Sequence, residues 1–319
     1  MPFTPRSAWV ISDGAAGNER QALALAAALD VPARVLVLPL RPPWSWCAPR
    51  QLPGGRLALS ARDREAFTPP WPDLAIGCGR DAALLTRMLR SLSDGACFTV
   101  QILDPRLDTR HWDAVIAPRH DDLAGANVIR TLGALNPVDD AWLASAREAF
   151  PDFGALPRPR IALLVGGPGR GIEFDARLAQ ALAGTVAALA QGGSVLATAS
   201  RRTPAPFAQS LRDALAKFPG VFWSGGGANP YPGILGWADR IVVTPDSVNM
   251  ISEACATGLP VHTVTTAPLP DIRARFHDAL RERGLLTDPG APPGHAPPLR
   301  ETGEVAAQLR AMFAARHAA

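Results

Sequence analysis

Short apolar runs alternate with longer segments of helical pattern along the chain. In the first half the apolar runs occupy residues 7–12, 34–39, 73–79, 98–103, 113–118 and 127–132. They are rich in Val, Ile and Leu and do not alternate with polar residues, which is typical of parallel strands covered by helices on both faces. Helical patterns over 18–29 and 81–92 separate some of these runs. The first half therefore predicts an α/β domain.

The same alternation restarts at residue 160, after a segment, 150–160, that holds three prolines and a glycine and is typical of a hinge. Strand-like runs follow at 160–167, 194–200, 220–224, 240–245 and 261–266. We predict two Rossmann-like domains with mainly parallel sheets facing across a cleft. We assign 1–150 to the N-terminal domain, 160–300 to the C-terminal domain, and 301–319 to a closing helix that packs back on the N-terminal domain.

Composition narrows the class of protein. Of 319 residues, 47% are hydrophobic and 19% charged, and no apolar run reaches the roughly 20 residues that a membrane span needs. The N-terminal stretch lacks the apolar core of a secretory signal, so we expect a cytoplasmic protein. The four cysteines show no C-x-x-C spacing, so no zinc site or disulfide framework is indicated. The net charge is +3 without a continuous basic stripe, which does not favour nucleic acid as a partner.

Residues 40–72 do not fit the alternation. This segment contains Trp44, Trp46 and Trp71 with several prolines and arginines, and a loop of this length is often functional. Exposed tryptophan beside arginine can hold an acceptor substrate or contact a membrane surface. The alternative is a loop that its own tryptophans fold back on the domain.

The stretch RIVVTPDSVNMISEACATGLPV, residues 240–261, combines a buried strand with a helix that has a polar side. Ser247 or Asp246 is placed to cap this helix. Asn249 and Glu253 lie at i and i+4, opposite its apolar side, and Glu253 has the chemistry to accept hydrogen bonds from a ribose diol. The alternative is a capped surface helix with solvated Asn and Glu. Asp246 would repel a phosphate placed at the tip of the helix.

Three more polar or glycine-rich stretches follow predicted strands of the second domain. LLVGGPGRGIEFD, residues 163–175, lets the backbone approach a ligand closely, although many strand-to-helix turns are glycine-rich. The turn after 194–200 offers two arginines and two hydroxyls, which form either a phosphate clamp or a solvated turn: Ser200, Arg201, Arg202 and Thr203. In 223–233, Asn229 is placed to shape a base pocket. Together these stretches favour a nucleotide diphosphate site at one edge of the sheet.

The first domain offers two candidate general bases. Asp13 ends the first predicted strand and would face a bound acceptor; alternatively it is an Asp-Gly turn residue. His120, in APRHDD, follows another strand and is the second candidate. A histidine in a turn beside aspartates is otherwise structural.

Several of these motifs together resemble a known family. ISDGAAGNERQALALAAAL, IGCGRDAAL, VQILDPRLD, LVGGP, ASRRTP and WADRIVVTPDSVNMISEACATGLPV are similar to bacterial relatives of the plant mitochondrial-fission (elongated-mitochondria) family, over residues 8–266. That family looks like a branch of the GT-B glycosyltransferases. By this resemblance, Glu253 falls where GT-B enzymes bind ribose, and Gly166 and Gly167 lie on the loop that faces the donor diphosphate.

We therefore expect a GT-B glycosyltransferase that moves a sugar from a nucleotide-diphospho-sugar to an acceptor hydroxyl, with inversion and without a metal or other cofactor. Arg201, Arg202 and the helix beginning at Ser247 would stabilise the leaving diphosphate. The expected partners are the nucleotide-sugar and an acceptor such as a lipid-linked or cell-envelope glycan, with peripheral contact at the inner face of a membrane. The alternatives are a non-catalytic scaffold related to mitochondrial-fission factors and a nucleotide-sugar epimerase. The base and sugar of the donor and the oligomeric state are not specified by the sequence.

Overall fold

The computed structural model describes residues 5–291 and 296–318, with the helix residue Ala318 described by its backbone alone. The outermost residues of the predicted first domain and closing helix, 1–4 and 319, lie outside this range. The chain divides into two compact units: residues 1–137 together with 301–319, and residues 138–300.

The first unit is built on a six-stranded sheet in which every pair of neighbouring strands is parallel. In spatial order the strands are β2 (Ala33–Val37), β1 (Ala8–Ser12), β3 (Leu74–Cys78), β4 (Phe98–Ile102), β5 (Ala114–Pro118) and β6 (Val128–Thr131). All strands except the edge strands β2 and β6 are buried along their whole length, as their continuous apolar runs predicted.

Helices cover both faces of this sheet. Helices α1 (Ala16–Ala28) and α11 (Thr302–Ala318) form one core with the side chains of Val10, Ile76 and Val100. On the opposite face, Trp9 and Ile11 pack with α4 (Arg80–Leu92). Successive residues of β1 thus enter different cores, because side chains alternate across a strand.

The segment 40–72 folds into α2 (Trp44–Cys47), the 3₁₀ turn η1 (Gly55–Ala58) and α3 (Ala61–Ala66). Trp71 makes an edge-to-face contact with Trp9, their ring centroids 5.9 Å apart, and Trp44 is half-buried against the same core. Trp46 is 75% exposed. Two of the three tryptophans therefore fold the segment back on the unit, and the third remains at the surface.

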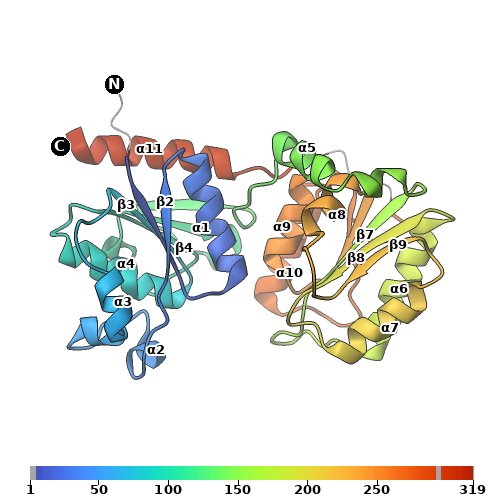
Figure 1. Ribbon diagram of the computed structural model, residues 1–319, viewed down its shortest axis with the longest axis horizontal. Helices are drawn as coiled ribbons and strands as arrows, with labels where there is room; N and C mark the ends of the chain where they lie inside the picture. The colour runs from blue at the N-terminus through green and yellow to red at the C-terminus, as the bar shows by residue number, and fades with distance from the viewer. Residues whose placement is uncertain (1–4, 292–295, 319) are drawn as a thin grey trace. The chain divides into compact units, whose positions relative to one another are not determined.

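The second unit contains a five-stranded sheet, again parallel throughout. Its order is β11 (Val261–Thr263), β10 (Arg240–Val243), β7 (Arg160–Val165), β8 (Ser194–Ala199) and β9 (Gly220–Trp223). Helices α6 (Ala176–Ala190) and α7 (Ala205–Leu215) form a core with one face of the sheet. On the other face lie α8 (Tyr231–Trp237), α9 (Val248–Ala256) and α10 (Asp271–Glu282) (Figure 1). The prediction of two α/β units with parallel sheets is confirmed.

The division between the units does not fall at the predicted hinge, 150–160. Residues 140–149 form helix α5 (Asp140–Ala149), which packs on α8 of the second unit, and residues 151–155 form a 3₁₀ turn. The guanidinium Nε of Arg147 donates to the carbonyl of Gly236 at 2.7 Å. The predicted boundary at 150 is therefore too late by about one helix, because prolines mark any turn and not only a linker between domains.

Helix α11 is held to the first unit at its start and along its length. The carboxylate of Glu301 accepts hydrogen bonds from the backbone N–H groups of Leu132 and Gly133 at 2.8–3.0 Å. Thr302 exchanges hydrogen bonds with the backbone of Asn136. Further along, Phe313 is buried and lies edge to face with Phe98, their centroids 5.5 Å apart. None of the helices in the described ranges is long and apolar enough to span a membrane.

Because Phe313 fills part of the first core, Phe313→Ala should lower the free energy of unfolding of the first unit by about 3–5 kcal/mol. Urea titration followed by fluorescence measures this change. The matched control is Gln308→Ala, on the exposed side of the same helix, which should change stability by less than about 0.5 kcal/mol. Equal effects of the two substitutions would show that α11 is not part of the core.

Candidate functional site

The second sheet has its topological switch point between β7 and β10. The chain runs from β7 outward through β8 and β9, then crosses back to place β10 on the other side of β7. Ligands of open α/β sheets bind beyond the carboxyl ends of the strands at such a point. Two of the stretches that the sequence predicted as ligand-binding, the glycine-rich loop after β7 and the turn after β10, meet here.

A buried carboxylate joins these loops. Asp246, 4% exposed, accepts hydrogen bonds from the N–H of Gly167 at 3.0 Å and from the hydroxyl of Thr244 at 2.7 Å. The Thr244 hydroxyl in turn accepts from the N–H of Gly166 at 2.8 Å. A guanidinium nitrogen of Arg202, from the loop after β8, lies 3.1 Å from Asp246 Oδ2. Three loops are thus tied together at the carboxyl edge of the sheet.

The glycine pair is required by this packing. A Cβ at Gly166 would lie 2.3 Å from both carboxylate oxygens of Asp246, and a Cβ at Gly167 would lie 2.6 Å from the Cβ of Arg202. Neither position has room for a side chain. By the resemblance this loop faces the donor diphosphate; in this structure the N–H groups of Gly166 and Gly167 donate to Thr244 and Asp246.

The four residues proposed as a phosphate clamp separate into two kinds. The hydroxyls of Ser200 and Thr203 donate to the carbonyl of Gly166 and so hold the glycine loop. Arg201 is exposed and has no side-chain hydrogen bond or ion pair within the described residues. The Arg202 side chain is 61% exposed even though it pairs with Asp246. The two guanidinium groups are therefore the part of this quartet that remains at the surface.

Helix α9 is capped and buried. Ser247 is the N-cap, and its hydroxyl accepts from the N–H of Met250 at 3.3 Å. Glu253 is only 2% exposed, and the Tyr231 hydroxyl donates to its carboxylate. Asn249 is half-buried. The interpretation of Glu253 as a solvated surface residue is wrong, because α8 places Tyr231 against the polar side of the helix.

Asn229 is exposed and precedes α8. Its side-chain oxygen accepts from the N–H of Tyr231 at 3.1 Å, which starts the turn into the helix. Asn229 is thereby connected, through Tyr231, to Glu253. The loop after β9 and the helix after β10 are consequently neighbours.

One further residue at this edge, His277, carries no signal in the local sequence pattern. This side chain, on α10, is fully buried, and its Nε2 lies 3.0 Å from the carbonyl oxygen of Pro245 in the turn after β10. Burial lowers the pKa of His277 to about 4, the Pro245 hydrogen bond opposes this shift, and Arg281 and Arg273 add to it. His277 is thus a neutral donor that fixes the turn carrying Asp246.

The first sheet has its own switch point, between β1 and β3. Asp13 follows β1, and its Oδ1 accepts from the N–H of Ala15 at 2.9 Å. Gly79 follows β3 with a φ of +89°, and a Cβ there would lie 2.5 Å from the side-chain nitrogen of Asn18. Burial raises the pKa of Asp81, Arg80 opposes the shift, and the negative charge of Asp13 adds to it. Asp13 therefore lies at the position where the topology predicts a ligand.

His120 does not share this position. It follows β5, which is three strands away from β1 in the sheet, a separation of roughly 14 Å at the usual strand spacing. The residue is 9% exposed, and its Nε2 lies 3.8 Å from a carboxylate oxygen of Asp121. The two candidate bases thus belong to different places on the sheet, and the geometry favours Asp13.

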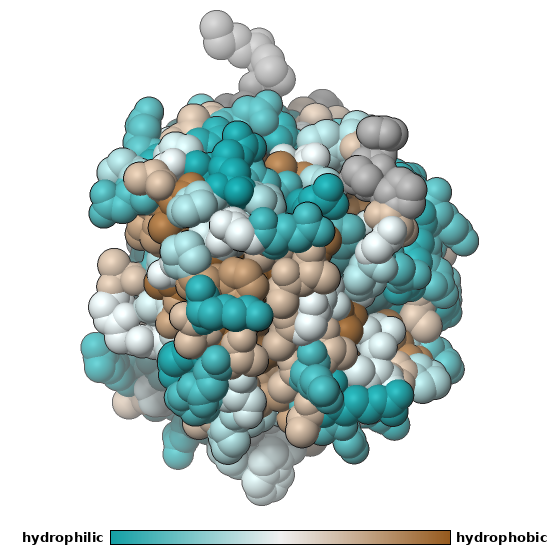
Figure 2. All heavy atoms as spheres, turned by 90° about the vertical axis from the view of Figure 1, so that its right-hand side faces the viewer, coloured by the Kyte–Doolittle hydropathy of each residue, from teal (hydrophilic) through white to brown (hydrophobic). Residues whose placement is uncertain are grey.

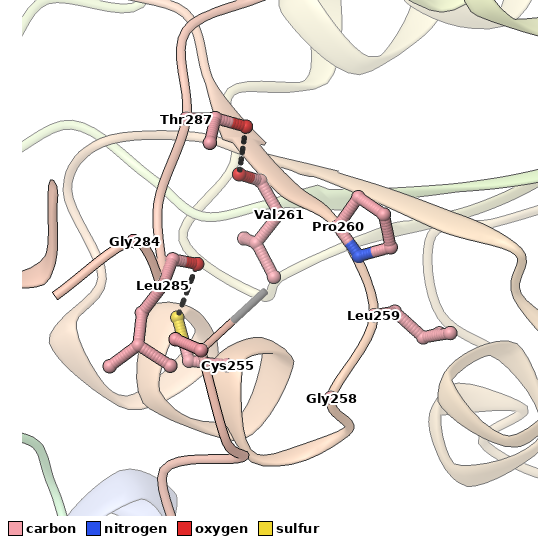
Figure 3. Close-up of a pocket in the computed structure, with 9 residues that line it drawn as sticks. Cys255, Gly258, Leu259, Pro260, Val261, Gly284, Leu285 and Thr287 are labelled. Carbon is pink, nitrogen blue, oxygen red and sulfur yellow. Dashed lines mark hydrogen bonds between the residues drawn. The ribbon is translucent and has the colours of Figure 1, made fainter. Parts of the chain in front are cut away.

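Two hollows in the structure lie near the amino-terminal ends of strands, away from the carboxyl ends where the switch points are. One is enclosed by the turn between α9 and β11 and by residues that include Cys255, Gly284 and Leu285 (Figure 3). Its volume of about 10 Å³ holds at most one water molecule. The other, about 580 Å³, lies beside Trp112 and Asn127, where β5 and β6 begin. Neither lies at a switch point.

Comparison with known proteins places the chain in a family. The model of the family described as "Mitochondrial fission ELM1" matches residues 16–313. The "Mitochondrial fission protein ELM1" of Arabidopsis thaliana is 35% identical over 284 residues, which are 79% of this chain and 66% of that protein. The chain therefore spans just under two thirds of this relative's length.

Solved structures share the two-unit fold. The UDP-GlcNAc 2-epimerase of Methanocaldococcus jannaschii superposes with a TM-score of 0.57 and 12% identity, covering 96% of this chain and 99% of that one. The MurG of Acinetobacter baumannii superposes with a TM-score of 0.50 and 14% identity, covering 97% and 92%. These similarities confirm the GT-B-like fold.

Because Asp246 satisfies three donors at once, Asp246→Asn should destabilise the second unit. The amide has one acceptor oxygen and faces at least one donor with its NH₂ group, so the free energy of unfolding should fall by about 2–3 kcal/mol. Urea titration measures the loss. Asp288→Asn, which removes an exposed partner of Arg281, is the control and should cost at most about 1 kcal/mol. A loss at Asp246 no larger than that at Asp288 would contradict the central role of this carboxylate.

His277 should make stability depend on pH. Its folded pKa of about 4 lies below the usual value near 6.5, so between these values the unfolded chain binds a proton that the folded chain does not. Stability therefore falls as the pH is lowered, by about 2 kcal/mol between pH 7 and pH 5. In His277→Gln, whose amide can still donate to Pro245, this part of the pH dependence should disappear. If the free energy of unfolding of the two proteins depended on pH in the same way, His277 would bind its proton in the folded protein as readily as in the unfolded chain.

Proposed function

Since the chain belongs to the mitochondrial fission ELM1 family and has a GT-B-like fold, we propose that it is a glycosyltransferase that uses a nucleotide-diphospho-sugar. The observation that carries this proposal is the switch point of the second unit. There Asp246 holds three loops in place, and two arginines remain at the surface. A rigid edge with outward guanidinium groups suits an anionic, phosphate-bearing ligand.

The charge at this edge favours release of a diphosphate. Negative charge develops on the leaving nucleoside diphosphate as the sugar–oxygen bond breaks, and fixed donors stabilise it without reorganisation. Arg201 and Arg202 supply these donors, and the N-terminus of α9 beyond Ser247 adds the positive end of a helix dipole. The sequence suggested that Asp246 would repel a phosphate. In the structure its negative charge is compensated by Arg202 and by the N–H of Gly167, which would reduce this repulsion. Transfer would then proceed without a metal.

Asp13 is the proposed general base. Its carboxylate would take the proton from an acceptor hydroxyl as the hydroxyl oxygen attacks the anomeric carbon from the face opposite the leaving group, which inverts that centre. The proposed acceptor is a glycan or a lipid-linked hydroxyl. His120, buried and distant from Asp13 along the sheet, has no part in this step.

Glu253 and Asn229 would recognise the nucleoside. Ribose presents two neighbouring hydroxyls, and a single carboxylate can accept a hydrogen bond from each of them. In the structure the Tyr231 hydroxyl donates to the Glu253 carboxylate. Ribose binding therefore requires Tyr231 to move away, or the carboxylate to accept from Tyr231 and from ribose at once. Asn229, exposed beside Tyr231, would contact the base.

One observation favours a second candidate, a nucleotide-sugar epimerase. The epimerase of M. jannaschii superposes with a higher TM-score than MurG, 0.57 against 0.50. An epimerase converts the donor sugar without an acceptor. Change of the donor incubated alone, followed by NMR of the sugar protons, would distinguish this activity from transfer.

Nucleotide binding is the first test. In calorimetric titrations with UDP, ADP, GDP and their sugars, one nucleotide should bind, and Arg201→Gln should weaken it about 10- to 100-fold because a charge-assisted hydrogen bond to phosphate is lost. Arg201 makes no contact that folding needs, and the control Arg177→Gln removes an equally exposed arginine of α6. If none of these ligands binds, the chain is a non-catalytic scaffold and the proposal is wrong.

Turnover is the second test. Asp13→Asn should leave nucleotide affinity unchanged and lower the transfer rate about 10²- to 10⁴-fold. Asp30→Asn, an exposed aspartate just beyond α1, is the matched control and should retain the full rate. Transfer at the wild-type rate by Asp13→Asn would remove this residue from the mechanism.

A further inference from the structure

The segment from residue 31 to residue 62 contains no aspartate or glutamate. It carries five arginines, all exposed: Arg34, Arg41, Arg50, Arg56 and Arg62. Some exposed arginines elsewhere in this protein pair with a carboxylate, as Arg110 does with Asp108 and Arg158 with Asp239. Within the described ranges none of the five forms an ion pair. This segment therefore gathers five positive charges with no acidic residue among them, and the described residues supply none of the five with an ion-pair partner.

The same segment exposes apolar side chains. Among the described residues the exposed large hydrophobics include Leu23 and Ile272, and the remainder of this group belongs to residues 31–62: Val35 at 39%, Val37 at 52%, Trp46 at 75% and Leu57 at 53%. Apolar residues are visible on another face of the protein as well (Figure 2), and single ones are normal. What distinguishes this segment is that its apolar residues lie among arginines and not among carboxylates.

Trp46 and Leu57 are presented from adjoining, anchored turns. The N–H of Arg41 donates to the carbonyl of Ala58 at 2.8 Å, which closes the segment that contains α2 and η1. A guanidinium nitrogen of Arg80, on α4, donates to the carbonyl of Ser45 at 3.1 Å. Beneath them Trp44 packs into the core. We call the residues Arg41, Trp46, Arg50, Arg56 and Leu57 the Trp46 surface.

We propose that the Trp46 surface docks the protein on an anionic phospholipid bilayer. Tryptophan is favoured at the level of lipid headgroups because its ring is apolar and its N–H is polar, and Leu57 adds apolar area that acyl chains would cover. The three arginines bind the acidic headgroups. A nucleic acid would use the charge but not Leu57, which offers no stacking face. The proposal does not depend on the glycosyltransferase function, because vesicle binding needs no nucleotide.

Flotation of the full chain with vesicles tests this. The protein should float with vesicles of 70% phosphatidylcholine and 30% phosphatidylglycerol and remain unbound with phosphatidylcholine alone. Trp46→Ala should weaken binding on the order of tenfold through lost apolar contact. The double variant Arg50→Gln/Arg56→Gln should weaken binding about 30-fold at low salt. Raising the salt concentration should also weaken binding of the wild type.

Matched controls separate this surface from general charge and apolarity. Arg177→Gln/Arg283→Gln removes two exposed arginines of the second unit, and Ile272→Ala removes an exposed apolar residue there; both should bind as the wild type does. Melting temperatures of all variants should agree, since each changed side chain is exposed. Equal binding to both vesicle types, or equal loss in test and control variants, would overturn the proposal. Binding to a DNA oligonucleotide but not to anionic vesicles would overturn it as well.

Discussion

The carboxylate of Asp246 is the interaction on which the second unit's functional edge depends. A buried charge is stable only when its hydrogen bonds are complete, and here they come from Gly167, Thr244 and Arg202 on three separate loops. Further residues support this arrangement. Gly166 and Gly167 leave room for the carboxylate, and the hydroxyls of Ser200 and Thr203 donate to the carbonyl of Gly166. His277 hydrogen-bonds to the carbonyl of Pro245 in the same turn as Asp246. Most of the polar residues at this edge therefore hold one another, and Arg201 is the guanidinium group that faces outward without a partner among the described residues. An edge assembled in this way is ordered before any ligand arrives.

The two units place opposite charges at the same topological position. Each sheet has one switch point, and in each a glycine there lies close to a side chain of a neighbouring segment: Gly79 is close to Asn18 of α1, and Gly166 to Asp246. The switch point of the second unit presents arginines. The switch point of the first unit presents Asp13, whose negative charge acts on the neighbouring Asp81. One fold thus places arginines at the switch point of one unit and a carboxylate at that of the other, and these are the groups that the proposed sugar transfer would use.

The strands were predictable because a buried parallel strand needs a continuous apolar run, and each predicted run became a strand. Helices α5 and α8 were missed: the first lies directly before the proline-rich segment 150–160, and the second begins with Tyr-Pro-Gly, a sequence typical of a turn. At the candidate site, the strand-end positions were predicted but the partners were not. Spacing places Glu253 opposite the apolar side of α9, yet only the packing of α8 decides that Tyr231 covers it. His277 lies on a helix far along the chain, and no local pattern connects it to Pro245.

Helix α11 also bears on how the protein is made. Val305, Leu309 and Phe313 belong to the same core as α1 and β1, so α1 and β1 leave the ribosome well before the helix that completes their core. The second unit, residues 138–300, is synthesised in between, which takes roughly ten to thirty seconds at ordinary elongation rates. Throughout that interval Val10, Leu25 and Phe98 lack the helix that covers them. The second unit can therefore complete its folding before the first, and a nascent chain of this protein exposes an unfinished apolar face that chaperones would bind.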